Sequence, residues 1–230
     1  MNGYEYIKRN YDSLISELKE YSDALGVPTP KLVSVTKSGT DEELLALFSI
    51  GASACGENRP QELKRRGELL RANGLFPELH EIGSLQTNKV KMIAEGVTLI
   101  HSLDRLALAE EIDKQARKIG RKIPVLIEIN SAEEQSKGGI MPKDAERFYE
   151  SVAGLEGISV KGLMTMGPVC DNPEDIRKYF RSTKALFDKM NDKYGFGDEA
   201  VLSMGMSDSY RIAIEEGSTL VRVGRRLFVR

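Results

Sequence analysis

The chain has 230 residues and a formal net charge of -2, from 33 lysines and arginines against 35 aspartates and glutamates. Hydrophobic residues make up 40% of it and charged residues 30%. This balance excludes an intrinsically disordered chain, which combines low hydrophobicity with high net charge. It also disfavours a strongly basic nucleic-acid-binding protein, because a near-neutral chain lacks the field that attracts phosphate backbones.

The order of the residues disfavours two further classes. No run of about 18 apolar residues occurs, so the sequence predicts no membrane span. The polar N-terminus MNGYEYIKRN contains no apolar signal region. Cys55 and Cys170 are too few for a disulfide framework or a structural zinc site, and neither His80 nor His101 has a second ligand at close spacing. We therefore expect a cytoplasmic protein without a metal site.

The first predicted element is an amphipathic helix over residues 4–25. Its apolar side chains recur in steps of three and four residues, the spacing of one helix face. They are Ile7, Tyr11, Leu14, Leu18, Tyr21 and Leu25. Gly26 and Pro28 follow and predict the end of the helix.

After this helix, short apolar runs alternate with helical stretches. The runs typical of buried strands lie at 31–36, 50–56, 78–83, 97–102, 123–130, 158–166, 200–205 and 219–223. The predicted helices lie at 40–50, 58–73, 86–95, 104–119, 142–154, 173–194 and 207–216. Thr40 and Glu43 have the spacing of a capping box. Asp171 and Asn172 precede Pro173, which is typical of another helix start.

Strands that alternate with helices predict a parallel sheet. Eight strands are the number that closes a (β/α)8 TIM-type barrel, and 230 residues lies within the usual length of that fold. An open doubly wound sheet is the alternative. No linker rich in Gly, Ser or Pro divides the chain. We therefore expect residues 1–230 to form a single barrel domain, with the helix at 4–25 packed on it as an extra element.

Lys37 is the most distinctive residue at the C-terminal ends of the predicted strands, the face where barrel active sites lie. It directly follows the first strand. A lysine that is partly desolvated at a barrel mouth has a lowered pKa and can attack a carbonyl to form a Schiff base. The alternative is an ordinary solvated loop lysine.

The loops after the last two strands indicate phosphate binding. Ser207 begins the predicted helix after the seventh strand, and Gly224 and Arg225 follow the eighth. Glycines let a backbone approach a ligand, and amides at a helix N-terminus bind anions. Barrels commonly hold phosphate with these two loops. Ser207 could instead simply cap its helix. Together with Lys37, a phosphate site here suits pyridoxal 5'-phosphate (PLP).

Arg222 lies within the aliphatic eighth strand. A buried arginine is rare unless a partner pairs with it. The pyridine nitrogen of PLP could be that partner, and an arginine there would discourage protonation of the ring and weaken it as an electron sink. Alternatively, Arg222 points outward or pairs with a carboxylate.

At these residues the sequence resembles the pyridoxal phosphate homeostasis protein family, single-barrel relatives of the N-terminal domain of alanine racemase. The matching stretches run from about residue 30 to about residue 228. They include VSVTK at 33–37, GEN at 56–58, HEIGSLQTNK at 80–89, SMGMSD at 203–208 and GSTLVRVG at 217–224. The resemblance implies a protein that binds PLP and keeps the cell's B6 vitamers and amino-acid pools in balance, without robust catalytic turnover.

The resemblance also assigns the cofactor-binding residues. It implies Lys37 for the Schiff base, Arg222 for the pyridine nitrogen, Asn58 and Met204 for the ring, and Ser207, Gly224 and the amide of Arg225 for the phosphate. Lys89 and Lys137, in matching loops, are either second cofactor contacts or surface lysines. Two departures from the family pattern affect this site: Arg59-Pro60 where an aromatic residue is common, and Arg225 where a threonine is common. A guanidinium at 225 could replace the missing hydroxyl with a charge-assisted phosphate contact.

A PLP-dependent, racemase-like enzyme is the alternative function. It needs a second base opposite the lysine, which in alanine racemase comes from an additional β-domain of a partner subunit. This chain ends at Arg230, shortly after the eighth strand, so the base would have to be His80, Ser84 or Tyr210. A third reading is a phosphate-binding barrel with an unremarkable Lys37. We further expect exchange of PLP with PLP-dependent apo-enzymes, no nucleic-acid or membrane partner, and a monomer or weak dimer.

Overall fold

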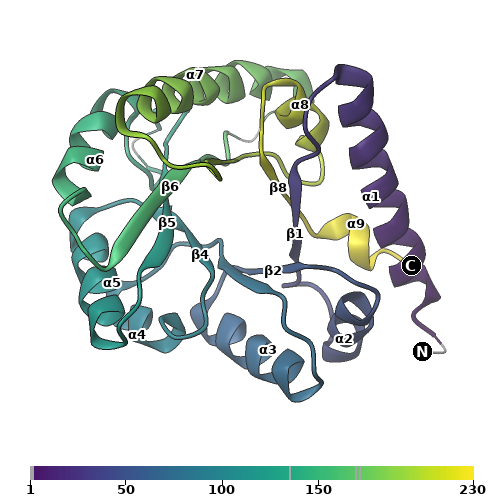
Figure 1. Cartoon of the computed structure of the whole chain (residues 1–230). Helices are drawn as coiled ribbons and strands as arrows, with labels where there is room; N and C mark the ends of the chain where they lie inside the picture. The colour runs from purple at the N-terminus through teal and green to yellow at the C-terminus, as the bar shows by residue number, and fades with distance from the viewer. Residues whose placement is uncertain (1–2, 135, 169, 171) are drawn as a thin grey trace.

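Eight parallel strands close into a barrel in their sequence order, and β8 pairs with β1 (Figure 1). The computed structural model describes residues 3–134, 136–168, 170 and 172–230. The strands are β1 (Lys31–Val35), β2 (Ala54–Glu57), β3 (Glu78–Glu81), β4 (Leu99–Leu103), β5 (Ile123–Glu128), β6 (Ile158–Met164), β7 (Val201–Ser203) and β8 (Leu220–Val223). The predicted TIM-type barrel is confirmed, and the open doubly wound sheet is wrong.

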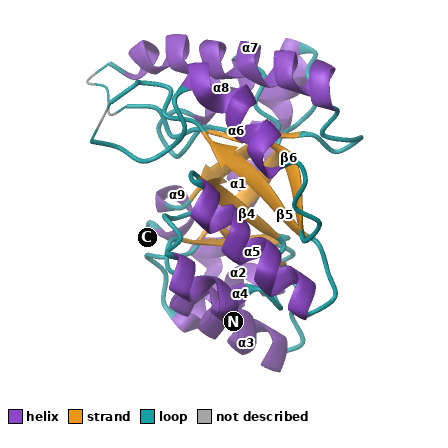
Figure 2. Ribbon diagram, turned by 90° about the vertical axis from the view of Figure 1, so that its left-hand side faces the viewer, coloured by secondary structure: helices purple, strands orange, loops and turns teal. Residues whose placement is uncertain are grey.

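Helices surround the strands and cover the outside of the barrel (Figure 2). They are α2 (Asp41–Ser49), α3 (Pro60–Ala72), α4 (Val90–Ile93), α5 (Leu106–Lys118), α6 (Ala145–Val152), α7 (Arg177–Tyr194) and α8 (Tyr210–Glu215). Short 3-10 helices lead into three of them: η1 (Thr87–Lys89), η2 (Pro142–Asp144) and η3 (Pro173–Ile176). No described helix combines the length and the apolar character that a membrane span needs.

The first helix, α1 (Glu5–Leu25), is outside the repeat, as predicted. Its buried stripe includes Ile7, Leu14 and Leu18, and it packs against α2, α8 and the short C-terminal helix α9 (Arg225–Phe228) (Figure 1). The chain therefore brings its two ends together beside β1 and β8. The sequence did not predict α9, because four residues are too short to show a periodic pattern.

Local capping signals in the sequence predicted some helix starts correctly and misplaced others. Thr40 and Glu43 form both hydrogen bonds of the predicted capping box at the start of α2. Asn172 accepts a hydrogen bond from the Glu174 N–H at the start of η3; Asp171 lies outside the described residues. The helix predicted from residue 207 instead begins at Tyr210, so the proposal that Ser207 caps a helix is wrong.

The apolar core has two parts, one on each side of the strands. Side chains that point into the barrel form a small cluster of Val33, Ala54, Leu99, Leu126, Met164 and Leu220. A larger cluster fills the space between the strands and the helices. Because side chains alternate across a strand, the residue two positions beyond an inward-facing one also faces inward. That alternation carries His101, Glu128 and Arg222 into the barrel interior above the apolar layer.

Candidate functional site

Lys37 lies in the turn just after β1, at the C-terminal end of the barrel. Its side chain is exposed, whereas the sequence predicted partial desolvation. It lines a cavity of about 740 Å³ together with Asn58, Glu57 and Arg66. Asn58 is exposed directly after β2, so these two predicted site residues share one opening.

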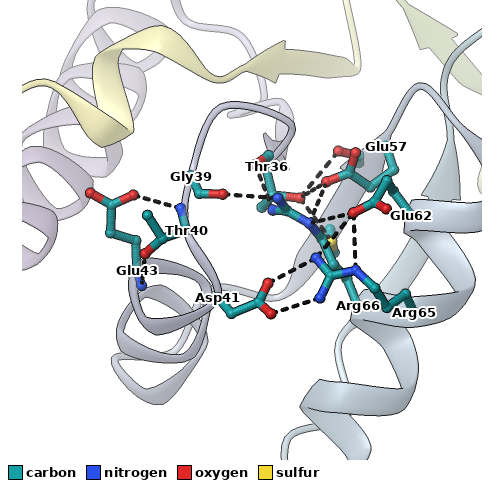
Figure 3. Close-up of polar contacts among 11 residues, drawn as sticks. Thr36, Gly39, Thr40, Asp41, Glu43, Glu57, Glu62, Arg65 and Arg66 are labelled. Carbon is teal, nitrogen blue, oxygen red and sulfur yellow. Dashed lines mark hydrogen bonds and ion pairs between the residues drawn. The ribbon is translucent and has the colours of Figure 1, made fainter.

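A buried arginine on α3 holds the turn that carries Lys37. Arg66 Nη1 donates to the Thr36 carbonyl oxygen at 2.6 Å and Nη2 donates to the Gly39 carbonyl oxygen at 2.8 Å (Figure 3). Lys37 and Ser38 lie between these two carbonyls in the chain. A planar guanidinium can satisfy two acceptors at once, which fixes the turn rather than merely contacting it.

Two buried glutamates, Glu57 on β2 and Glu81 on β3, are partners in the strand register next to this turn. Glu57 accepts a hydrogen bond from Thr36 Oγ1 at 2.5 Å, and its Oε1 lies 3.3 Å from Arg66 Nε. Burial raises the pKa of Glu57, while the Thr36 hydrogen bond and the Arg66 charge act in the opposite direction. Burial also raises the pKa of Glu81 to about 8, and its Oε2 has no partner among the described residues. Glu81 is therefore largely protonated at neutral pH.

Arg222 points into the barrel and is almost fully buried. Its Nη1 donates to Ser203 Oγ at 2.5 Å and its Nη2 donates to the Thr165 carbonyl oxygen at 3.0 Å. Burial lowers the pKa of Arg222 to about 10, and the nearby Glu128 carboxyl opposes that shift, so the guanidinium is a cation at neutral pH. The alternative of an outward-facing Arg222 is wrong. Burial raises the pKa of Glu128 itself to about 7, with Asp104 adding to the shift.

The predicted phosphate residues gather at the ends of β7 and β8, where Gly224 and Arg225 stand at the start of α9 but Ser207 precedes α8 by three residues. Ser207 is half-buried in the turn after β7. Gly224 is buried, and a Cβ there would lie 2.7 Å from the Val35 carbonyl oxygen, so this glycine lets β8 approach β1. The Arg225 guanidinium pairs with the Asp208 carboxylate, and both side chains are exposed.

The remaining predicted contact residues are Met204, Lys89 and Lys137, and the Met204 side chain does not lie where the sequence predicted. Met204 is fully buried in the cluster between strands and helices, rather than in the mouth of the barrel. Two other methionines, Met166 after β6 and Met206 after β7, are exposed instead. Lys89 is half-buried, and Lys137 forms an exposed ion pair with Glu134.

The three candidate second bases have different surroundings. The Tyr210 hydroxyl contacts Glu17 and Arg226 on the outside of the barrel. The His80 ring is buried inside the barrel. Ser84 alone is exposed in a loop at the C-terminal ends of the strands. Pro60, which stands in the Arg59-Pro60 departure, is the first residue of α3, where its fixed φ suits a helix start.

Residues 10–229 match the sequence model of the alanine racemase N-terminal domain. The pyridoxal phosphate homeostasis protein of Aquifex aeolicus is 43% identical over 198 residues, which are 86% of each chain. That of Helicobacter pylori (strain 26695) is 35% identical over 224 residues, covering 96% of this chain and 97% of the relative. The chain belongs to the pyridoxal phosphate homeostasis protein family. This confirms the resemblance drawn from the sequence motifs.

Solved structures of similar proteins have the same architecture. PipY of Synechococcus elongatus with PLP bound superposes with a TM-score of 0.84 at 27% identity, covering 97% of this chain and all of PipY. An unknown protein from Bifidobacterium adolescentis gives a TM-score of 0.90 at 32% identity, covering 98% and 95% of the two chains. An alanine racemase of Clostridium difficile shares the fold, with a TM-score of 0.75 at 20% identity, and this chain covers 56% of it.

Proposed function

We propose that this member of the family binds PLP, holds it as a Schiff base on Lys37, and serves vitamin B6 homeostasis without robust catalytic turnover. The observation that carries the proposal is the placement of an exposed lysine after β1 and a buried cationic arginine on the adjacent β8 at one end of the barrel. The names of the relatives and the PLP-bound state of PipY support it.

The residues at this end of the barrel have functional groups that match those of PLP. The Lys37 amine matches an aldehyde, and the Arg222 guanidinium, which only donates hydrogen bonds, matches an unprotonated pyridine nitrogen. Asn58 would contact the ring, and Ser207 with the Gly224-Arg225 backbone would hold the phosphate. Met204 could contribute only its backbone there, because its side chain is buried elsewhere.

The same residues favour binding of PLP without catalytic turnover of an amino acid. When bound, PLP supplies an electrophilic aldehyde and a ring that withdraws electrons most strongly when its nitrogen is protonated. Arg222 has no site that accepts a proton and opposes that protonation by its charge. Tyr210 and His80 are engaged away from the mouth, and Ser84, the candidate at the mouth, is a hydroxyl that is a weak base unless another group activates it. The proposed protein is therefore a carrier of PLP rather than a racemase.

Three further parts of the proposal concern the protein in the cell. Residues 1–230 act as one PLP-binding domain, either as a monomer or as a weak dimer. PLP-dependent apo-enzymes are the recipients, because the exposed Lys37 leaves the cofactor open to exchange. The location is the cytoplasm, which is supported by the free thiols of Cys55 and Cys170.

The test is a titration of the purified protein with PLP, followed by absorbance and by equilibrium dialysis. We expect one equivalent to bind with the visible band of a Schiff base. Lys37→Ala should lose the band and bind PLP at least about tenfold more weakly, a loss of about 1.4 kcal/mol or more. Lys19→Ala is the matched control, since Lys19 is an exposed lysine on α1 paired with Asp23. An unchanged band in Lys37→Ala would refute the proposal.

A further inference from the structure

Two histidines and a serine connect Arg222 to the opposite end of the barrel. Ser203 Oγ lies 3.0 Å from His101 Nδ1, and His101 Nε2 lies 2.9 Å from His80 Nδ1. His80 Nε2 in turn lies 3.0 Å from Glu78 Oε2. With the 2.5 Å bond from Arg222 to Ser203, these contacts form one continuous chain of four hydrogen bonds through the barrel interior.

When both imidazoles are neutral, the Glu78 end fixes the direction of every hydrogen bond between Glu78 and Ser203, and the Arg222 end is compatible with that direction. Arg222 can only donate, so Ser203 Oγ accepts from it and has its own proton to give to His101 Nδ1. At the other end the Glu78 carboxylate can only accept, so His80 carries its proton on Nε2. His101 must then donate from Nε2 to His80 Nδ1. With neutral imidazoles the Glu78 end requires this arrangement, in which each ring is protonated at Nε2 and bare at Nδ1, and the Arg222 end is compatible with it because Ser203 keeps a proton to donate.

The surrounding groups keep this series of hydrogen bonds in that arrangement. Burial lowers the pKa of His80, with the Glu78 carboxylate acting against it and Lys31 acting with it. Burial lowers the pKa of His101 well below its ordinary value, and the neighbouring His80 and Arg222 act in the same direction. Hydrogen bonds from His80 and Lys31 lower the pKa of Glu78 to about 2. At neutral pH the two imidazoles are therefore uncharged, between a cation at one end and an anion at the other.

We propose that Ser203, His101 and His80 are positioning residues, which hold Arg222 as a hydrogen-bond donor at the mouth of the barrel through a one-way relay to Glu78. The inference rests on the proposed function only in naming the acceptor, the pyridine nitrogen of PLP. The Lys31–Glu78 ion pair, Nζ to Oε1 at 2.5 Å, anchors the far end of the relay. The relay would thus extend the cofactor site through the whole barrel.

Nitrogen NMR of the cofactor-free protein tests the relay without PLP. The chain contains two histidines, so the imidazole spectrum holds only two rings. We expect both rings to show a protonated Nε2 and a bare Nδ1 at and above neutral pH, and to titrate only below the ordinary range of a free histidine. We also expect hindered rotation of the Arg222 guanidinium. A protonated Nδ1 on either ring, or titration of either ring near its ordinary pKa, would overturn the proposal.

Variants at Ser203 separate positioning from folding. Ser203→Ala should move the His101 Nδ1 resonance toward that of a nitrogen without a donor, release the Arg222 guanidinium to rotate, and weaken PLP binding about tenfold. Ser203→Thr should restore all three. Ser102→Ala is the matched control, because Ser102 is a buried serine on β4 whose Oγ has no partner among the described residues.

The outcomes distinguish this inference from the proposed function. If Ser203→Ala leaves the His101 resonance and the Arg222 rotation unchanged, the relay is wrong, regardless of how tightly the variant binds PLP. If the wild-type protein binds no PLP but shows the expected imidazole states and the hindered guanidinium, the relay stands and the proposed function fails. If Ser203→Ala does not fold, the imidazole and guanidinium states of the wild-type protein still decide.

Discussion

Arg66 Nη1 on α3 donates to the carbonyl oxygen of Thr36, 2.6 Å away, immediately before the exposed lysine of the site. This single side chain ties the turn after β1 to α3, the third element after that turn. It also compensates the buried Glu57 carboxylate. The position of Lys37 therefore depends on a buried side chain that comes from a different element.

Arg66→Ala should be strongly destabilising. It leaves the Thr36 and Gly39 carbonyls without their donor and Glu57 without its ion-pair partner, and breaking a buried ion pair typically costs about 3–5 kcal/mol. Arg66→Lys should recover only part of the loss, because an ammonium cannot bridge both carbonyls in the same way. Urea denaturation measures both. The control is Arg65→Ala, which removes exposed pairs with Asp41 and Glu62 and should cost less than about 1 kcal/mol. Equal losses for the two alanine variants would contradict this account.

Glu81 makes stability fall as the pH rises. Its pKa in the folded protein is about 8 against 4.5 for an ordinary glutamate, so the folded state binds its proton more tightly between these pH values. That contribution is fully present below about pH 4.5 and is lost as the pH rises through about 8. Glu81→Gln mimics the protonated form. It should match the wild type near pH 5 and be about 4 kcal/mol more stable near pH 9, from about three pH units at about 1.4 kcal/mol each.

Urea denaturation at both pH values tests this behaviour of Glu81. The exposed Glu42 on α2 supplies the control, since Glu42→Gln should give the same small difference at both. A Glu81→Gln protein that is less stable than the wild type near pH 9 would show that the carboxylate form is the native one.

Glu17 ties α1 to the C-terminal part of the chain and has the opposite pH dependence. Its carboxylate accepts from Arg226 at 2.7 Å and from Arg211 Nε at 2.8 Å, and the Tyr210 hydroxyl also contacts it. The Arg226 hydrogen bond is the main cause that lowers its pKa to about 2. Its contribution is present above about pH 4.5 and is lost as the pH falls through about 2.

Glu17→Gln should therefore lose about 1–2 kcal/mol of stability at neutral pH, allowing for the partial exposure of the side chain. The difference from the wild type should shrink in acid. Thermal denaturation followed by circular dichroism across this range measures it. Glu20→Gln, at an exposed position of the same helix, should have almost no effect. A pH-independent loss in Glu17→Gln would point to packing rather than charge.

Gly224→Ala should disturb the pairing of β8 with β1. The added Cβ would lie 2.7 Å from the Val35 carbonyl oxygen, a backbone atom that cannot rotate away. We expect a loss of about 1–3 kcal/mol, the usual range for overpacking. Gly154→Ala is the control, because nothing lies within 4 Å of a Cβ there. Denaturation curves that coincide for the two variants would contradict the proposed close approach.

Features that depend on residues close in sequence were predictable. The Thr40–Glu43 capping box and the buried stripe of α1 involve separations of three and four residues, and both are present. The barrel followed from counting apolar runs. Lys37 and Arg222 were found because each is a charge in or just after an aliphatic strand.

Features that depend on contacts between distant elements were not predictable from one sequence. The relay joins His80, His101 and Ser203 from three strands, and the alternation of side chains was the only available signal. Nothing in the sequence pairs Arg66 with the Thr36 carbonyl, which lies 30 residues away. The Met204 side chain lies in the outer core rather than at the mouth, because one step along the chain after β7 moves a side chain from the barrel interior to the outside of the barrel.

The most direct test of the central claim is borohydride reduction of the PLP-saturated protein, followed by intact mass and peptide mapping. The account predicts one pyridoxyl phosphate per chain, attached at Lys37, with no adduct on Lys37→Ala and a normal adduct on Lys19→Ala. An adduct on another lysine, or none on the wild-type protein, would contradict it.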